Sequence, residues 1–280
     1  MKSLIKKIMS IALILTVTAT LAACGNSKDT SNAGESMLAK IKEKDTLVVG
    51  TAPGYPPYEF VVSKDGKSEV VGADIDLAEN IAKDLGVKLE IKALDFDALI
   101  PALEAEKIDV IIAGMTPTED RKKSVDFSDV YKDATNSVLV RSDYNKNLKT
   151  SDDLKNIKVG VQRGTIQETF MIETLKSDKV KSLVSVPDLV ADLKNGNIDA
   201  VVLSTEVALI NEKSYEGIKV DKKIDLKDFK DGEGSAVAIK KGENKDFIES
   251  LNKTIKDLKD SGEYDKIMEK NIDLASKNKN

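Results

Sequence analysis

The fold is decided in one stretch of sequence, Ile108-Asp109-Val110-Ile111-Ile112-Ala113-Gly114-Met115-Thr116-Pro117-Thr118-Glu119-Asp120-Arg121-Lys122-Lys123. Its first five residues form an apolar run that indicates a buried strand. Thr118 is a favourable N-cap, so we expect a short helix to start there with two acidic residues in its first turn. Backbone N–H groups, the Thr116 hydroxyl and the Arg121 guanidinium would then meet where a strand ends and a helix begins, which is where α/β folds bind ligands. Together these groups suit a carboxylate, because a guanidinium binds it with two parallel hydrogen bonds.

The presence of arginine rather than lysine at position 121 supports a carboxylate site. The only arginines of the chain are Arg121, Arg141 and Arg163, and every other basic residue is lysine. A chain that covers its surface with lysine gains from arginine the planar fork that lysine lacks. The alternative is that Arg121, which precedes two lysines, is one more solvated charge on a helix.

Composition narrows the class of protein. The 280 residues suffice for two modest domains, and 41% hydrophobic with 32% charged residues is typical of a globular chain. The net charge of -5 gives no reason to expect nucleic acid as a partner. With no histidine and one cysteine, Ser-His-Asp and Cys-His catalysis are excluded, and we expect neither a metal site nor a cofactor.

The chain opens with a targeting segment. Three early residues are basic, namely Lys2, Lys6 and Lys7. The apolar stretch that follows, residues 8–21, is too short and too rich in threonine to span a membrane well. We therefore expect residues 1–23 to be a signal peptide.

This segment ends in Leu21-Ala22-Ala23-Cys24-Gly25, which resembles the lipobox of bacterial lipoproteins. The resemblance implies that Cys24 carries lipid and becomes the new N-terminus, with several acyl chains holding the protein at the extracellular face of the membrane. Residues 24–36 are small and polar, and we interpret them as a flexible tether. The alternative for Cys24 is a spare thiol after an ordinary signal peptide.

Beyond the tether, strands and helices are predicted to alternate, as expected for an α/β fold with a mostly parallel sheet and helices on both of its faces. Strands are predicted at 46–50, 58–62, 68–71, 87–93, 108–112, 136–141, 158–161, 183–186, 200–203 and 235–240. Helices are predicted at 37–44, 75–85, 96–103, 118–123, 166–175, 187–194, 245–258 and 264–268, and Ser151 is expected to cap one more. Two similar units and a late return of the chain predict two lobes joined by two crossings, with lobe 1 formed by 37–132 and 235–280 and lobe 2 by 133–234.

Five motifs in a fixed order resemble the amino-acid-binding family of extracellular solute-binding proteins of ABC importers. They are the 46–50 strand with Tyr55-Pro56-Pro57-Tyr58-Glu59-Phe60, then Gly72-Ala73-Asp74-Ile75-Asp76-Leu77, Asp95-Phe96-Asp97-Ala98-Leu99-Ile100-Pro101, the opening stretch, and Val159-Gly160-Val161-Gln162-Arg163-Gly164-Thr165-Ile166-Gln167-Glu168. The resemblance runs from about Thr46 to the end of the chain. It implies two α/β lobes, a hinge of two crossing strands, and an amino acid that is enclosed when the lobes close.

Carried over residue by residue, the resemblance implies that Arg121 pairs with the α-carboxylate of the ligand. It implies further that Gly114 and Thr116 contact the ligand through backbone and hydroxyl, and that Tyr55 and Phe96 sandwich its side chain. Two of these residues have a simpler alternative. Phe96 also fits the apolar stripe of its helix, and Tyr55 also fits loop packing beside its prolines.

In the second lobe, the resemblance implies that Thr165 and Ile166 complete the carboxylate site at the start of a helix, where free N–H groups favour an anion. Gln162 and Gln167 match positions that often contact the ligand side chain. Thr165 is also a plausible N-cap, but a cap and an anion site use the same amides, so the two interpretations overlap.

One departure from the family concerns the ligand ammonium. The acid that usually receives it is matched here by Ser204, with Glu206 two residues further on. Serine accepts a hydrogen bond but cannot neutralise an ammonium, and a buried unpaired charge is costly. Either Glu206 reaches the ligand, which we favour, or the ligand lacks a free amine, or the chain is a divergent member. The absence of an acid in Ala52-Pro53-Gly54 favours a polar neutral or small ligand over arginine or lysine. The alternative is that Glu206, if it does not meet the amine, restores a preference for cations.

The leading hypothesis is therefore a monomeric extracellular lipoprotein, without catalytic residues, that captures an L-amino acid and delivers it to a membrane permease. Two other functions stay open. A ligand-sensing subunit of a membrane receptor would bind equally well and differ only in its partner. A dehydratase-like enzyme on the same fold would need a carboxylate in the cleft, such as Glu206.

Overall fold

A computed structural model of the protein describes residues 36–229, 234–242 and 244–278. The predicted signal peptide, Cys24 and all but the last residue of the predicted tether lie outside the described residues. The strands are β1 (Thr46–Thr51), β2 (Phe60–Lys64), β3 (Lys67–Val71), β4 (Lys88–Ala93), β5 (Val110–Ile111), β6 (Val125–Lys132), β7 (Asn136–Arg141), β8 (Val159–Gln162), β9 (Val180–Leu183), β10 (Ala200–Ser204), β11 (Ile218–Val220) and β12 (Ser235–Lys240). The helices are α2 (Met37–Glu43), α3 (Ala73–Leu85), α4 (Leu99–Glu104), α5 (Arg121–Ser124), α6 (Ile166–Thr169), α7 (Val186–Lys194), α8 (Thr205–Ser214), α9 (Lys245–Asp260) and α10 (Glu263–Lys277), with short helical turns η1 (Phe96–Ala98), η2 (Ser151–Asn156) and η3 (Phe170–Thr174).

The predicted α/β fold with two sheet-bearing lobes is confirmed. The first sheet has the strand order β4-β1-β5-β12-β6 and the second the order β11-β7-β10-β8-β9, and β2 with β3 forms a separate hairpin. The expectation of mostly parallel sheets is wrong. Only β4-β1-β5 and β10-β8-β9 pair in parallel, whereas β12, β6, β7 and β11 pair antiparallel. The antiparallel strands are those next to the passages between the sheets, where the chain arrives from the other lobe.

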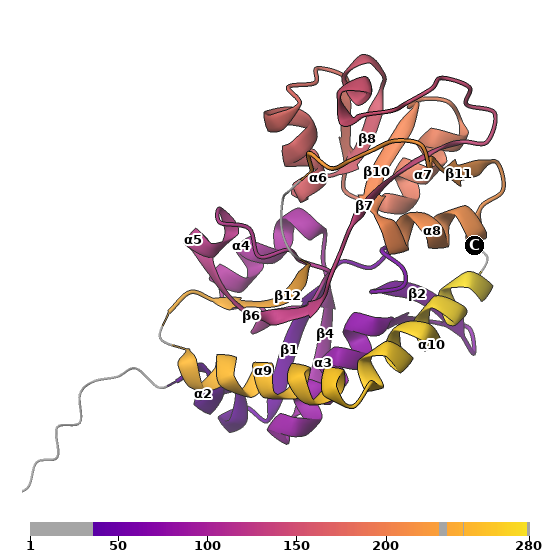
Figure 1. Ribbon diagram of the computed structural model, residues 1–280. Coiled ribbons are helices and arrows are strands. Elements are labelled where there is room, and N and C mark those ends of the chain that lie inside the picture. Colours follow the sequence, from indigo (N-terminus) through magenta and orange to yellow (C-terminus); the bar gives the residue numbers. More distant parts are fainter. Residues whose placement is uncertain (1–35, 230–233, 243, 279–280) are drawn as a thin grey trace, which may run out of the picture. The chain divides into compact units, whose positions relative to one another are not determined.

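The chain passes between the two sheets at adjacent places. It leaves the first sheet at the end of β6 and enters the second at β7, three residues later (Figure 1). On its return it re-enters the first sheet at β12, where Ser235 pairs with Lys132. Gly234 has a φ of +145°, and a Cβ there would lie 2.3 Å from the Lys132 carbonyl oxygen. The two passages are therefore too close together for a side chain at this position.

Helices cover the first sheet with continuous apolar faces. The face of α3 buries Leu77 and Ile81, and α9 buries Phe247 and Leu251. Figure 1 shows α9 and α10, at the yellow end of the chain, running alongside α3. Each fully buried large apolar side chain stabilises the fold by about 1.5–3 kcal/mol, so these faces hold the C-terminal helices against lobe 1.

Some elements differ from the predictions. The strands β6 and β11 and the helix α8 were not predicted, and α10 extends nine residues beyond the predicted end at Met268, to Lys277. The helix expected to begin after Thr118 begins at Arg121, although the Thr118 hydroxyl accepts a 3.2 Å hydrogen bond from the Arg121 N–H. The 166–175 helix is split, because its second half is a π-turn. None of the helices in the described ranges combines the length and apolar character needed to cross a bilayer.

Candidate functional site

A polar pocket lies where strands of both sheets end. Residues after the carboxyl ends of β1 and β5 line it from the first lobe, and the ends of β8 and β10 line it from the second. This is the edge of an α/β sheet at which ligands bind. Its lining residues are Tyr55, Phe96, Ala113, Gly114, Thr116, Arg121, Ala134, Asn136, Gln162, Thr165, Ile166, Gln167 and Ser204.

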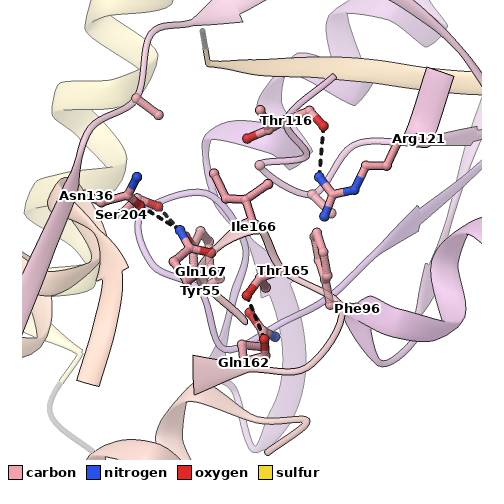
Figure 2. A pocket seen from close by; sticks show the side chains of 13 residues that line it. Tyr55, Phe96, Thr116, Arg121, Asn136, Gln162, Thr165, Ile166, Gln167 and Ser204 are labelled. Carbon is pink, nitrogen blue, oxygen red and sulfur yellow. Dashed lines mark hydrogen bonds between the residues drawn. The ribbon is translucent and has the colours of Figure 1, made fainter. Parts of the chain in front are cut away.

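Arg121 is the one charged side chain in this lining. Its Nη1 donates to the Thr116 carbonyl at 2.8 Å (Figure 2), and its Nη2 donates to the Gly164 carbonyl at 2.9 Å. Burial lowers the pKa of Arg121 to about 10, so the side chain remains a cation at neutral pH. Guanidinium has five N–H donors, of which these two bonds use two.

Within the described part of the chain, no acid compensates the charge of Arg121. The next two residues, Lys122 and Lys123, form ion pairs with acids of the preceding turn at 2.8 and 2.5 Å. Among the described residues no carboxylate pairs with Arg121. Its hydrogen bonds go to the two carbonyl groups, and its Cζ lies over the Phe96 ring, 5.3 Å from the ring centroid. A desolvated cation of this kind is costly unless an anion joins it. The arrangement suits a carboxylate.

The two aromatic side chains of the pocket also belong to the core. Phe96 is 8% exposed and packs with Leu99 and Leu103. Tyr55 stacks on Tyr58 with ring centroids 5.9 Å apart. The apolar alternative for Phe96 and the packing alternative for Tyr55 are therefore both correct, and the same rings still reach the pocket.

The second lobe contributes the start of a helix. Thr165 is the N-cap of α6, and its side chain accepts a hydrogen bond from the Glu168 N–H at 3.3 Å. The first N–H groups of a helix have no acceptor within it, so those of Ile166 and Gln167, ahead of the capped Glu168, suit an anion. Ile166 and Gln167, in this first turn, line the pocket.

Three uncharged polar residues, Asn136, Gln167 and Ser204, form what we call the polar wall. Figure 2 shows them together on one side of the pocket, with Arg121 and Phe96 on the other. The Gln167 amide donates to the Asn136 side-chain oxygen at 2.7 Å, and the Ser204 hydroxyl shares a short hydrogen bond with the Tyr55 hydroxyl. Ser204 is the N-cap of α8 but makes no side-chain cap bond. Its hydroxyl contacts the pocket instead of the helix.

Several contacts link the lobes around the pocket. The bonds from Tyr55 to Ser204 and from Arg121 to the Gly164 carbonyl join residues of the first lobe to residues of the second. Gly164 has a φ of +76°, and a Cβ there would lie 2.9 Å from the Cβ of Asp97. The structure therefore has the pocket held between lobes that touch.

Ten of the eleven residues predicted to bind ligand line the pocket. Glu206 does not. It lies in the first turn of α8, and one of its carboxylate oxygens is buried without a hydrogen-bond partner. Sequence reasoning missed Ala113, Ala134 and Asn136 as lining residues, of which the last two lie at the passage between the lobes. Asn136 pairs with Ser204 across β7 and β10, so knowledge of that strand pairing would have revealed it.

Two α/β lobes with a polar, largely uncharged pocket between them define a two-lobed ligand-binding protein. Residues 47–273 match the bacterial extracellular solute-binding proteins, family 3. The chain belongs to this family.

Named relatives agree with the assignment. The chain is 34% identical over 268 residues to the arginine-binding extracellular protein ArtP of Bacillus subtilis, covering 95% of this chain and 97% of the relative. It is 36% identical over 265 residues to a probable histidine-binding protein of Campylobacter jejuni, covering 95% and 98%. A solved amino acid ABC transporter substrate-binding protein from Streptococcus pneumoniae, bound to L-arginine, has a TM-score of 0.80 and 39% identity, covering 85% of this chain and 98% of that one. All three are binding proteins.

Proposed function

We propose that the protein captures an L-amino acid with a polar or neutral side chain and delivers it to the permease of an ABC importer. The observation that carries this proposal is the Arg121 guanidinium, a half-buried cation without an acidic partner among the described residues. In the proposed complex Arg121 and the first N–H groups of α6 hold the α-carboxylate from opposite lobes. Gly114 and Thr116 contact the ligand from the first lobe.

In the proposed mechanism, the ligand closes the pocket because both lobes supply contacts to it. Ligand bound to Arg121 in the first lobe gains further contacts only when Thr165 and Ile166 approach from the second. It therefore shifts the hinge equilibrium towards the closed form by the free energy of those added contacts. The contacts between Tyr55 and Ser204 and between Arg121 and Gly164 are of the kind that close such a pocket.

The preference for an uncharged side chain rests on charge balance. Arg121 with a zwitterionic ligand leaves the pocket at a net charge of about +1, and a lysine or arginine ligand would raise it to about +2 without a carboxylate in the lining. The polar wall offers hydroxyl and amide groups, which pair well with an amide or hydroxyl on the ligand. We assign Ser204, and not Glu206, to the ligand ammonium, because only Ser204 reaches the pocket.

A thermal-shift screen against the twenty amino acids tests this proposal, since a ligand raises the stability by RT ln(1 + [L]/Kd). We expect the largest shifts from polar neutral amino acids such as glutamine, asparagine, serine or threonine, and small shifts from arginine and lysine. A dominant shift with arginine would contradict the proposed preference. The absence of any shift with all twenty would contradict amino-acid capture.

We further propose that lipid on Cys24 anchors the protein outside the cell membrane. The proposal is supported by Leu21-Ala22-Ala23-Cys24-Gly25 after a basic and then apolar start. The full chain expressed in a bacterial host should partition into detergent and carry acyl mass on its N-terminal peptide. A Cys24→Ala variant that stays equally membrane-bound would contradict the anchor.

A further inference from the structure

Two carboxyl groups lie buried together behind the pocket. Glu59 is 1% exposed and Asp74 is 0% exposed. Glu59 closes the Tyr55 loop, since its carbonyl accepts hydrogen bonds from the Gly54 and Tyr55 N–H groups at 3.0 and 2.8 Å. Asp74 lies in the first turn of α3. Among the described residues neither carboxyl group has an ion-pair partner, so two buried negative charges would be very costly here.

Counting hydrogen bonds shows where a proton is needed. One Asp74 oxygen, Oδ2, accepts from the Gly114 N–H at 2.7 Å and from the Tyr131 hydroxyl at 2.9 Å. The other Asp74 oxygen and both Glu59 oxygens are buried without a donor. The two carboxyl groups lie close enough to influence each other's pKa, but two carboxylates are acceptors only. A proton between them provides the donor that both groups lack.

The surroundings decide which group carries the proton. Asp74 already accepts two hydrogen bonds and lies at a helix N-terminus, both of which favour its anion. Glu59 accepts none, and burial beside Asp74 raises the pKa of Glu59 well above its usual range. Burial raises the pKa of Asp74 to about 6, against the opposing hydrogen bonds of Gly114 and Tyr131. At neutral pH the arrangement is therefore a neutral Glu59 and an ionised Asp74.

Among the described residues, the elements packed against Glu59 and Asp74 place no cation beside the pair. The titratable groups that face the pair are Tyr55 and Tyr58 before β2, Tyr131 on β6 and Tyr264 on α10, with Glu206 on α8 beyond them. Burial raises the pKa of Tyr131 and of Tyr264 well above the usual range, so both keep their protons. Every group facing the pair is thus neutral or negative, which favours a proton on Glu59.

We propose that Glu59 is a positioning residue, held in the folded protein as a neutral carboxylic acid that donates its proton to Asp74. Through Asp74 it fixes the Gly114 N–H, and through its own backbone it fixes the Tyr55 loop. Both segments line the pocket, so loss of the proton as pH rises weakens the positioning of the pocket residues. The effect on ligand affinity rests on the proposed function, whereas the protonation of Glu59 does not.

Two ligand-free measurements on the full chain test the proposal. Infrared spectroscopy at neutral pH should show the carbonyl band of a protonated carboxylic acid, which Glu59→Gln removes and which the exposed control Glu69→Gln leaves in place. The same band should vanish as pH rises in the wild-type protein. A wild-type spectrum without this band at neutral pH would overturn the proposal even if no variant folds.

Denaturant unfolding from about pH 5 to pH 9 gives the second readout. The folded pKa of Glu59 lies above its unfolded value, so its stabilising contribution is complete below about pH 4.5 and is lost as pH rises through the folded pKa. The folding constant of Glu59→Gln relative to wild type should therefore rise by up to about tenfold per pH unit. Glutamine also donates to Asp74, so ligand affinity should stay within about threefold of wild type, whereas Glu59→Leu should lose about tenfold or more. Parallel pH profiles for wild type and Glu59→Gln would overturn the proposal.

Discussion

Replacing Arg121 is the perturbation whose outcome the structure specifies best. In Arg121→Ala the ligand carboxylate would enter the pocket with no cation to meet it, and removing one partner of a buried ion pair costs about 3–5 kcal/mol. At about 1.4 kcal/mol per factor of ten, Kd should rise by two to more than three orders of magnitude. A micromolar ligand would then bind near the millimolar range.

Arg121→Lys separates charge from geometry. Arg121 uses Nη1 and Nη2 on two carbonyl groups and keeps three N–H donors for the ligand. An ammonium has three donors on one atom and cannot hold both carbonyls and a carboxylate in this arrangement. We expect a loss of about 1.5–3 kcal/mol, or roughly 10- to 150-fold in Kd.

Isothermal titration calorimetry with the best amino acid from the thermal-shift screen measures both variants. The matched control is Lys122→Ala, which removes a neighbouring cation whose pair with Glu119 is exposed, and it should bind as the wild type does. Arg121 is desolvated without an anion, so Arg121→Ala should unfold at or above the wild-type midpoint when ligand is absent. Arg121→Ala binding within about threefold of wild type would refute the carboxylate role.

Two further substitutions test the rest of the pocket. Ser204→Asp places an acid beside the Tyr55 hydroxyl, where the family usually has one. Because hydrogen bonds to charged groups contribute about 1.5–3 kcal/mol, Ser204→Asp should tighten amino-acid binding about 10- to 100-fold and raise the affinity for arginine. Unchanged or weaker binding in calorimetry would argue that the ligand ammonium lies elsewhere. Arg163→Ala removes an interlobe pair with Asp97 that is 3.8 Å long and whose side chains are 52% and 30% exposed. It should change the affinity by less than about fivefold, and a larger loss would mean that this pair contributes to closure.

Ten of the predicted residues line the pocket because the resemblance of five motifs to a known family pointed to them, and several also sit at strand ends or helix starts, which carry local signals. Thr165 as an N-cap and Gly114 at a φ of +57° are examples. Asn136 had no such signal, since its place in the pocket follows from pairing with Ser204 far along the chain. Glu206 was predicted from its chemistry two residues after Ser204, and it lies in the first turn of α8 without lining the pocket.

In the fold, too, the elements that depend on residues distant in sequence were predicted poorly. The end of α10 was predicted too early because Asn271 interrupts the apolar pattern. It is buried and donates to Asp76 on α3 at 2.6 Å. The strand β6 escaped prediction because irregular pairing with β12 disturbs its alternation. Both elements are stabilised by partners distant in sequence, which periodicity within a short window cannot reveal.

The central claim is that a guanidinium between the lobes holds the carboxylate of the ligand. Its most direct test is calorimetry of the wild-type protein with two compounds, the best amino acid from the screen and its α-carboxamide, which keeps the amine and side chain but has no carboxylate. We predict saturable binding of the amino acid and no measurable binding of the carboxamide. Equal affinity for the two compounds would contradict the claim.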